Sequence, residues 1–92
     1  MKNEYKNTNE KLIQACKKGN SKAQFELYKR YAKSMYNVSY RILKDSAEAE
    51  DAMQEGFLKA FQNINAYLGE VSFGAWLKKI IVNTFFIRIN LN

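Results

Sequence analysis

Apolar residues recur every three or four positions through three long stretches of this chain, which is the spacing of one face of an α-helix. In residues 21–43 the apolar stripe consists of Phe25, Tyr28, Ala32, Met35, Ser39 and Ile42, widened by Tyr31, Val38 and Leu43. In residues 46–64 it consists of Met53, Phe57, Ala60, Phe61 and Ile64. From residue 73 onward it consists of Phe73, Trp76, Leu77, Ile80, Ile81 and Thr84. The pattern predicts three amphipathic helices that share one core.

Polar and turn-forming residues separate these stretches and mark where each helix begins. A shorter helix is expected before Gly19, which stands where a C-terminal glycine cap belongs. Asn20 or Ser21 then begins the next helix, and Gln24 is placed to form a capping box with Ser21. Ser46 and Ser72 are the expected N-caps of the last two helices. Residues 65–72 have the composition of a loop, and Lys44, Asp45 and Ser46 form a tight connection between antiparallel neighbours.

These boundaries predict an all-α protein, a compact bundle of about four helices. Residues 1–8 are polar and are expected to be a disordered N-terminal tail, and residues 9–92 a single domain. The 92-residue chain contains no proline and only four glycines, which favours helices over a turn-rich sheet.

Composition excludes several classes of function. With no histidine and only Cys16, the chain has no metal site built on these residue types, no histidine-based catalytic triad and no internal disulfide. No apolar run reaches the roughly 18 residues that span a membrane, and the polar N-terminus does not resemble a signal peptide. We therefore expect a cytoplasmic protein that needs no cofactor and inserts into no membrane.

The net charge of +6 is distributed unevenly along the chain. Residues 1–44 hold eleven Lys or Arg and three acids, whereas residues 45–55 hold five acids and no basic residue. Residues 56–92 hold four basic residues and one acid. Excess positive charge of this kind attracts polyanions, although an ordinary solvated surface explains the composition equally well.

The acidic stretch opens the helix predicted at residues 46–64, and this helix has a second face of interest. Three- and four-residue steps also bring together acids, amides and one leucine, namely Asp51, Gln54, Glu55, Leu58 and Gln62. Carboxylates suit the positive end of a helix dipole, so a solvated helix start is one interpretation. A docking face for another protein is the other. The carboxylates Glu50, Asp51 and Glu55 are not favoured as an acid/base catalytic pair. They lie at a solvated helix start with no histidine or phosphate-binding loop nearby. We therefore predict that the protein is not an enzyme.

Three segments of the chain resemble a known protein family. The sequence AEDAMQEGF at residues 49–57 is similar to the most characteristic segment of bacterial sigma factors of the sigma-70 family. Two further segments agree in order and separation with region 2 of the extracytoplasmic-function type, namely residues 19–28 and residues 69–77. The likeness covers roughly residues 9 to 84, and the three segments together are far more specific than any one of them.

The resemblance implies two partners, core RNA polymerase and promoter DNA. In the family the matching helix docks on the clamp helices of the largest subunit of core RNA polymerase, and the Asp-x-x-Gln-Glu spacing occurs here as Asp51, Gln54 and Glu55. Leu58 and Gln62 extend that face. The family also recognises the minus-ten promoter element as separated non-template strand, with one extruded base held beside the loop that precedes the last helix. By position the DNA-contacting residues would be Asn65, Tyr67, Leu68, Lys78, Lys79 and Asn83.

Simpler interpretations of the DNA side remain open. Tyr67 also suits a position at the edge of the core, and two adjacent lysines are common on any surface. Trp76 fits the core better than a stacking platform, and the lysines at 78 and 79 replace the aromatic residues that housekeeping sigma factors carry there.

The end of the sequence departs from the family pattern. Relatives continue into a linker and a helix-turn-helix domain, region 4, that reads the upstream promoter element, and we expect that domain to be absent here. The alternative function is therefore a protein-interaction module or truncated decoy, which would bind polymerase or an anti-sigma factor without recognising DNA. A nonspecific nucleic-acid binder is a third interpretation, based on charge alone.

Overall fold

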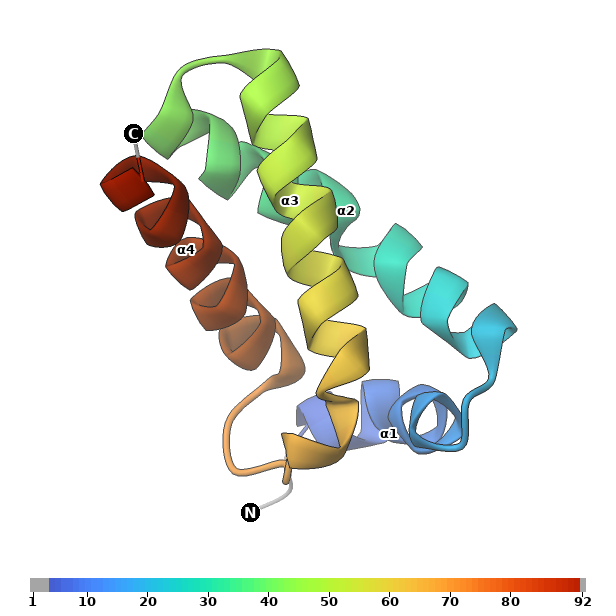
Figure 1. Cartoon of the computed structure of the whole chain (residues 1–92). Coiled ribbons are helices and arrows are strands. Elements are labelled where there is room, and N and C mark those ends of the chain that lie inside the picture. The colour runs from blue at the N-terminus through green and yellow to red at the C-terminus, as the bar shows by residue number, and fades with distance from the viewer. Residues whose placement is uncertain (1–3, 92) are drawn as a thin grey trace.

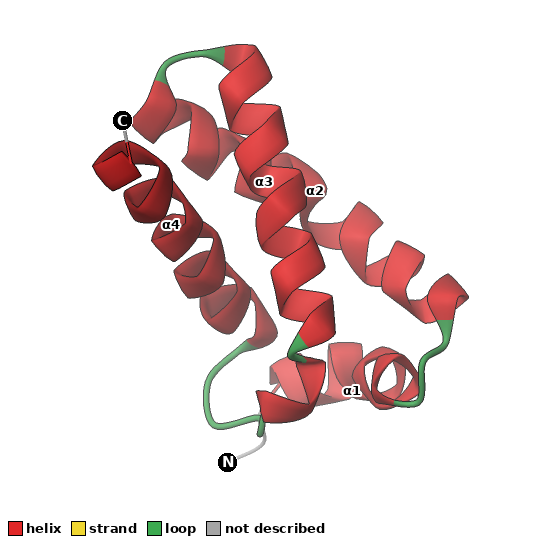
Figure 2. Ribbon diagram, viewed as in Figure 1, coloured by secondary structure: helices red, strands yellow, loops and turns green. Residues whose placement is uncertain are grey.

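The computed structural model describes the backbone of residues 4–91 and the side chains of residues 9–87. It contains four α-helices, α1 (Glu4–Lys17), α2 (Ser21–Leu43), α3 (Ser46–Gln62) and α4 (Phe73–Leu91), and a short 3-10 helix, η1 (Ile64–Ala66). No strand occurs within residues 4–91 (Figure 2). The predicted all-α bundle of about four helices is confirmed.

Helix α3 is the central element of the bundle. It packs against α2 and α4, and α1 packs against α2 at the end of the bundle where η1 follows α3 (Figure 1). The core is built from buried apolar residues of all four helices, among them Leu27, Phe57, Phe73, Leu77 and Ile81. Aromatic rings join the helices, because Tyr28 of α2 packs edge-on against Phe57 of α3 at 4.8 Å between ring centres.

The helix ends follow capping chemistry, with small shifts from the predicted positions. Gly19 has φ +84°, as a C-terminal glycine cap requires, and Ser72 Oγ accepts from the backbone N–H of Ala75 at 3.2 Å. The cap of α2 is Asn20, one of the two predicted residues, whereas the cap of α3 is Asp45, one residue before the predicted Ser46. The Asn20 side chain accepts from Ala23 N–H at 3.0 Å, and the Asp45 carboxylate accepts from Glu48 N–H at 2.8 Å.

Helix α4 runs on to Leu91, and the sequence pattern set no end for it. Two further predictions are corrected. Helix α1 begins at Glu4, inside the segment expected to be a disordered tail, while residues 1–3 lie outside the described part. Phe25 and Ile42 are exposed, because α2 contacts three other helices and its buried side is centred on Leu27, Met35 and Val38. The Phe25 ring instead lies beneath the Lys29 ammonium group, 5.0 Å from ring centre to nitrogen.

Within the described residues, every helix is too short or too polar to cross a lipid bilayer.

Candidate functional site

The acidic face of α3 is presented to solvent along most of its length. Asp51, Gln54, Leu58 and Gln62 are exposed, and Glu55 is half-buried. Leu58 keeps 58% of its surface exposed although it lies between the buried Phe57 and the half-buried Lys59. The structure thus brings together all five residues predicted for the docking face, and they form a single strip of carboxylates, amides and one apolar side chain.

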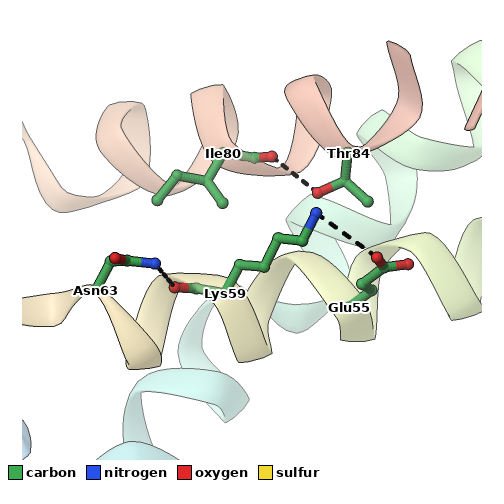
Figure 3. A network of polar contacts seen from close by, with 5 residues as sticks. All are labelled: Glu55, Lys59, Asn63, Ile80 and Thr84. Carbon is green, nitrogen blue, oxygen red and sulfur yellow. Dashed lines mark hydrogen bonds and ion pairs between the residues drawn. The ribbon is translucent and has the colours of Figure 1, made fainter. Parts of the chain in front are cut away.

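The opposite side of α3 holds this strip in a fixed orientation. Ala52, Met53, Phe57 and Ala60 are buried in the core, so α3 cannot rotate without breaking the core. Within the strip, Gln54 Nε2 donates to Glu50 Oε2 at 3.4 Å. Glu55 pairs with Lys59 at 3.6 Å, one helical turn further along (Figure 3). Both contacts are at the surface, where such pairs contribute little to stability and are easily exchanged for a partner's groups.

A shallow depression lies where α3 begins. Its lining residues are Ala47, Glu48, Glu50, Asp51 and Gln54, so the acidic strip starts in a hollow with three carboxylates. Among the described side chains, residues 9–87, no group of three or more acidic or cysteine residues has the arrangement of a metal site. The three carboxylates give this hollow an acidic lining.

A groove between α3 and α4 was not predicted from the sequence. Its lining residues are Lys59, Asn63, Ala66, Trp76, Ile80, Asn83, Thr84 and Ile87. Asn63 Nδ2 donates to the Lys59 carbonyl at 2.8 Å, and Thr84 Oγ1 donates to the Ile80 carbonyl at 3.1 Å (Figure 3). The signal that could have revealed the groove is the spacing of Trp76, Ile80, Asn83 and Ile87, which defines a second face of α4 beside its buried face.

The loop before α4 is anchored by Tyr67. This side chain is only 5% exposed, it packs against the rings of Phe73 and Trp76, and its hydroxyl donates to the Val71 carbonyl at 2.5 Å. The expectation that Tyr67 contacts DNA is therefore wrong for its side chain, which shapes the loop from inside. Asn65 and Leu68 are exposed as expected, and Leu68 is 74% exposed.

A small cavity of about 120 Å³ lies between α1 and this loop. It is lined by Glu10, Ile13, Gln14, Lys17, Tyr67, Leu68 and Gly69. The Lys17 ammonium donates to the Tyr67 carbonyl at 2.8 Å and so ties α1 to the loop. Gly69 has φ +79°, a conformation that favours glycine and lets the chain turn beside the cavity. The α1 residues of this cavity carried no signal in the sequence, because only folding brings them against residues 67–69.

Lys78, Lys79 and Asn83 are exposed on α4. Lys79 and Asn83 lie one turn apart, and Asn83 also lines the groove between α3 and α4. The predicted DNA side is therefore distributed over a loop with a cavity and the part of α4 that carries Lys78 and Lys79. Trp76 packs against Tyr67 and Phe73.

Comparison with known proteins gives one family. A model of sigma-70 region 2 matches residues 27–89. The chain is 35% identical over 79 residues to the ECF RNA polymerase sigma factor SigW of Bacillus subtilis, covering 86% of this chain and 42% of that protein. It is 32% identical to the ECF RNA polymerase sigma-E factor of Haemophilus influenzae, covering 84% and 40%. It is 29% identical to the RNA polymerase sigma-H factor of Pseudomonas aeruginosa, covering 82% and 39%. The chain thus spans about two fifths of the length of these relatives.

Proposed function

Because the chain belongs to the sigma-70 family and corresponds to its region 2, we propose that it acts in transcription initiation, in the cytoplasm, by docking on core RNA polymerase and contacting promoter DNA as a separated strand. The observation that carries this proposal is the exposed strip of acids, amides and one leucine on α3, held in place by a buried opposite face.

Docking uses the chemistry of the strip. Asp51 and Glu55 accept charge-assisted hydrogen bonds from Arg or Lys of the clamp helices, and Gln54 and Gln62 add neutral hydrogen bonds. Leu58 is the apolar anchor, because it is the most exposed large apolar residue of α3 and loses its hydration when it enters a partner's pocket. On binding, the partner's cation replaces Lys59 as the neighbour of Glu55.

DNA contact uses the loop before α4 and α4 itself. The cavity beside residues 67–69 receives a base extruded from the non-template strand of the minus-ten element, with Leu68 and Gly69 at its rim. Asn65 adds a polar contact in the loop. Lys78, Lys79 and Asn83 follow the phosphates of the strand along α4. Tyr67 contributes by fixing the loop and not by direct contact.

An anti-sigma protein is a further expected partner, since it would compete for the same exposed surfaces. The strip on α3 is available to a competitor as well as to polymerase.

The decisive experiment is titration of the purified chain against core RNA polymerase at moderate salt, alongside the variant Gln54→Ala with Glu55→Lys. The matched control is Gln14→Ala with Glu10→Lys, which makes the same chemical changes on α1. We expect the α3 variant to lose binding with unchanged helicity and the α1 control to bind like wild type. Undiminished binding by the α3 variant would sink the docking assignment.

A further inference from the structure

A third charged surface lies on α2 and shares no residue with the two surfaces described above. Arg30, Lys33, Ser34, Asn37 and Arg41 line a shallow depression on its outer face. These positions follow one another by one, three or four residues, so they form a stripe along the helix. All five side chains are exposed, and the lining contains neither a carboxylate nor an apolar side chain.

The stripe faces away from α3. Each residue advances about 100° round a helix, so Arg30 lies about 200° from Tyr28, the α2 residue whose ring packs on Phe57 of α3. The stripe therefore lies on the side of α2 opposite its contact with Phe57 of α3.

One cation of the stripe is held in place by a buried network. Arg30 Nη1 donates to Asn9 Oδ1 at 3.2 Å, and Asn9 Nδ2 donates to the Tyr31 hydroxyl at 2.6 Å. Asn9 is only 2% exposed, so it is a rigid support from α1. A surface arginine fixed from below loses little conformational freedom when a ligand binds.

The remaining cations are not neutralised by the fold. Lys33 and Arg41 make no ion pair within the described part of the chain, although Lys29 on the neighbouring face does pair with Glu26 at 3.4 Å. Arg30 and Lys33 stand three residues apart, where like charges destabilise a helix slightly. Folding alone therefore does not account for placing these cations together, whereas an anionic partner does.

The composition of the lining indicates which anion. Arg, Lys, Ser and Asn side chains are the usual donors to phosphate oxygens, and they carry no sequence information in that role. Single-strand sites add aromatic platforms on which bases stack, and this lining has none. Arg30 to Arg41 extends about 16 Å along a straight helix, which covers several successive phosphates of one strand.

We infer that the α2 stripe binds the phosphate backbone of double-stranded DNA without regard to sequence. It is a surface separate from the α4 lysines assigned to separated strand, and it would hold paired DNA beside the region that is opened.

The test measures binding of the whole chain to a fully paired duplex of mixed sequence, by fluorescence anisotropy, between about 50 and 200 mM salt. The stripe variant is Lys33→Gln with Arg41→Gln. The matched control is Lys11→Gln with Lys18→Gln, which removes the same charge from exposed sites on and just after α1. Each phosphate contact contributes about 0.9 to the slope of log affinity against log salt. We expect the slope of the stripe variant to be less steep by about 1.8, and that of the control to change by less than half as much.

Equal slopes for the stripe variant and the control would overturn the inference. Equal changes would mean that binding follows net charge alone, and no change in either would mean that the stripe does not contact the phosphates. Absence of duplex binding by the wild type would also overturn it. A stripe variant that binds duplex normally but loses polymerase affinity would assign the stripe to a protein interface instead. Failure of the α3 docking assignment is seen separately, in the polymerase titration with the Gln54 and Glu55 variant.

Discussion

Gly56 of α3 and Ile81 of α4 approach so closely that a β-carbon on Gly56 would clash with Ile81 Cγ1 and lie 3.1 Å from Ile81 Cα. Only a glycine allows this crossing of the two helices. The contact fixes the angle between the helix that carries the acidic strip and the helix that carries Lys78 and Lys79. The position of the acidic strip relative to the α4 lysines therefore depends on Gly56, which belongs to neither surface.

We predict that Gly56→Ala destabilises the protein, although alanine favours a helix by about 1 kcal/mol over glycine. The added methyl group overpacks the crossing, and we expect a net loss of about 1–3 kcal/mol in the free energy of unfolding. Chemical denaturation followed by circular dichroism measures it.

The double variant Gly56→Ala with Ile81→Ala is the control for this mechanism. Removing Cγ1 of Ile81 makes room for the new methyl group, so the combined loss should be smaller than the sum of the two single losses by about 1 kcal/mol or more. Strict additivity would mean that the two residues are not in contact.

The sequence predicted most of the fold because the apolar spacing is strong in α2, α3 and α4. The acidic strip was also predictable, since the helical period of α3 alone determines which of its residues share a face. Predictions failed where several neighbours determine the environment of a residue. Phe25 fits the predicted stripe but lies outside the region of α2 that other helices cover.

The cavity could not be predicted for the same reason, and the groove carried a sequence signal only on its α4 side. The cavity needs α1 beside residues 67–69, and the groove needs a particular rotation of α4 against α3. Tyr67 shows the limit at a single residue. Its place in a loop suggested a ligand contact, yet its ring fills the space between Phe73 and Trp76.

Phe57 and Leu58 are neighbours in sequence with opposite roles, and this gives a paired prediction. Phe57 is buried between Tyr28 and Phe61, so Phe57→Ala should cost about 3–5 kcal/mol in the free energy of unfolding. Leu58→Ala should change stability by no more than about 0.5 kcal/mol, because its side chain is exposed. Denaturant titration of both variants tests this, and a cost below about 1 kcal/mol for Phe57→Ala would remove Phe57 from the core.

The same Leu58→Ala variant is expected to weaken polymerase binding by roughly tenfold or more, as truncation of an interface anchor does. A folded variant with full affinity would show that Leu58 lies outside the docking contact. The exposed Leu68, in the loop before α4, provides the control, because Leu68→Ala removes the same atoms on the DNA side.

Cys16 reports on the packing of α1. It is 2% exposed, and burial raises the pKa of its thiol. The folded protein therefore binds the thiol proton more tightly than the unfolded chain, and this stabilisation is lost as pH rises above about 8.5, the ordinary thiol pKa, and through the raised value. We expect the free energy of unfolding to fall more steeply above that pH in wild type than in Cys16→Ala. Identical pH profiles would contradict a buried thiol.

In the native state the thiol of Cys16 should also react slowly with a disulfide reagent and become reactive only on unfolding.

The α4 lysines give the test of strand recognition. We predict that Lys78→Glu with Lys79→Glu abolishes binding to single-stranded DNA and leaves polymerase affinity unchanged, since both side chains are exposed on α4 and the acidic strip is on α3. Anisotropy with a labelled single strand measures the first property, and the polymerase titration measures the second.

Charge reversal alone weakens any DNA binder, so the comparison is with Lys11→Glu and Lys18→Glu, which reverse the same number of charges at exposed positions elsewhere. The α4 variant should lose at least tenfold more single-strand affinity than this control, because contact with phosphates is local whereas the effect of net charge is shared by both variants. Equal losses would mean that the strand is attracted by the whole protein and is not held along α4.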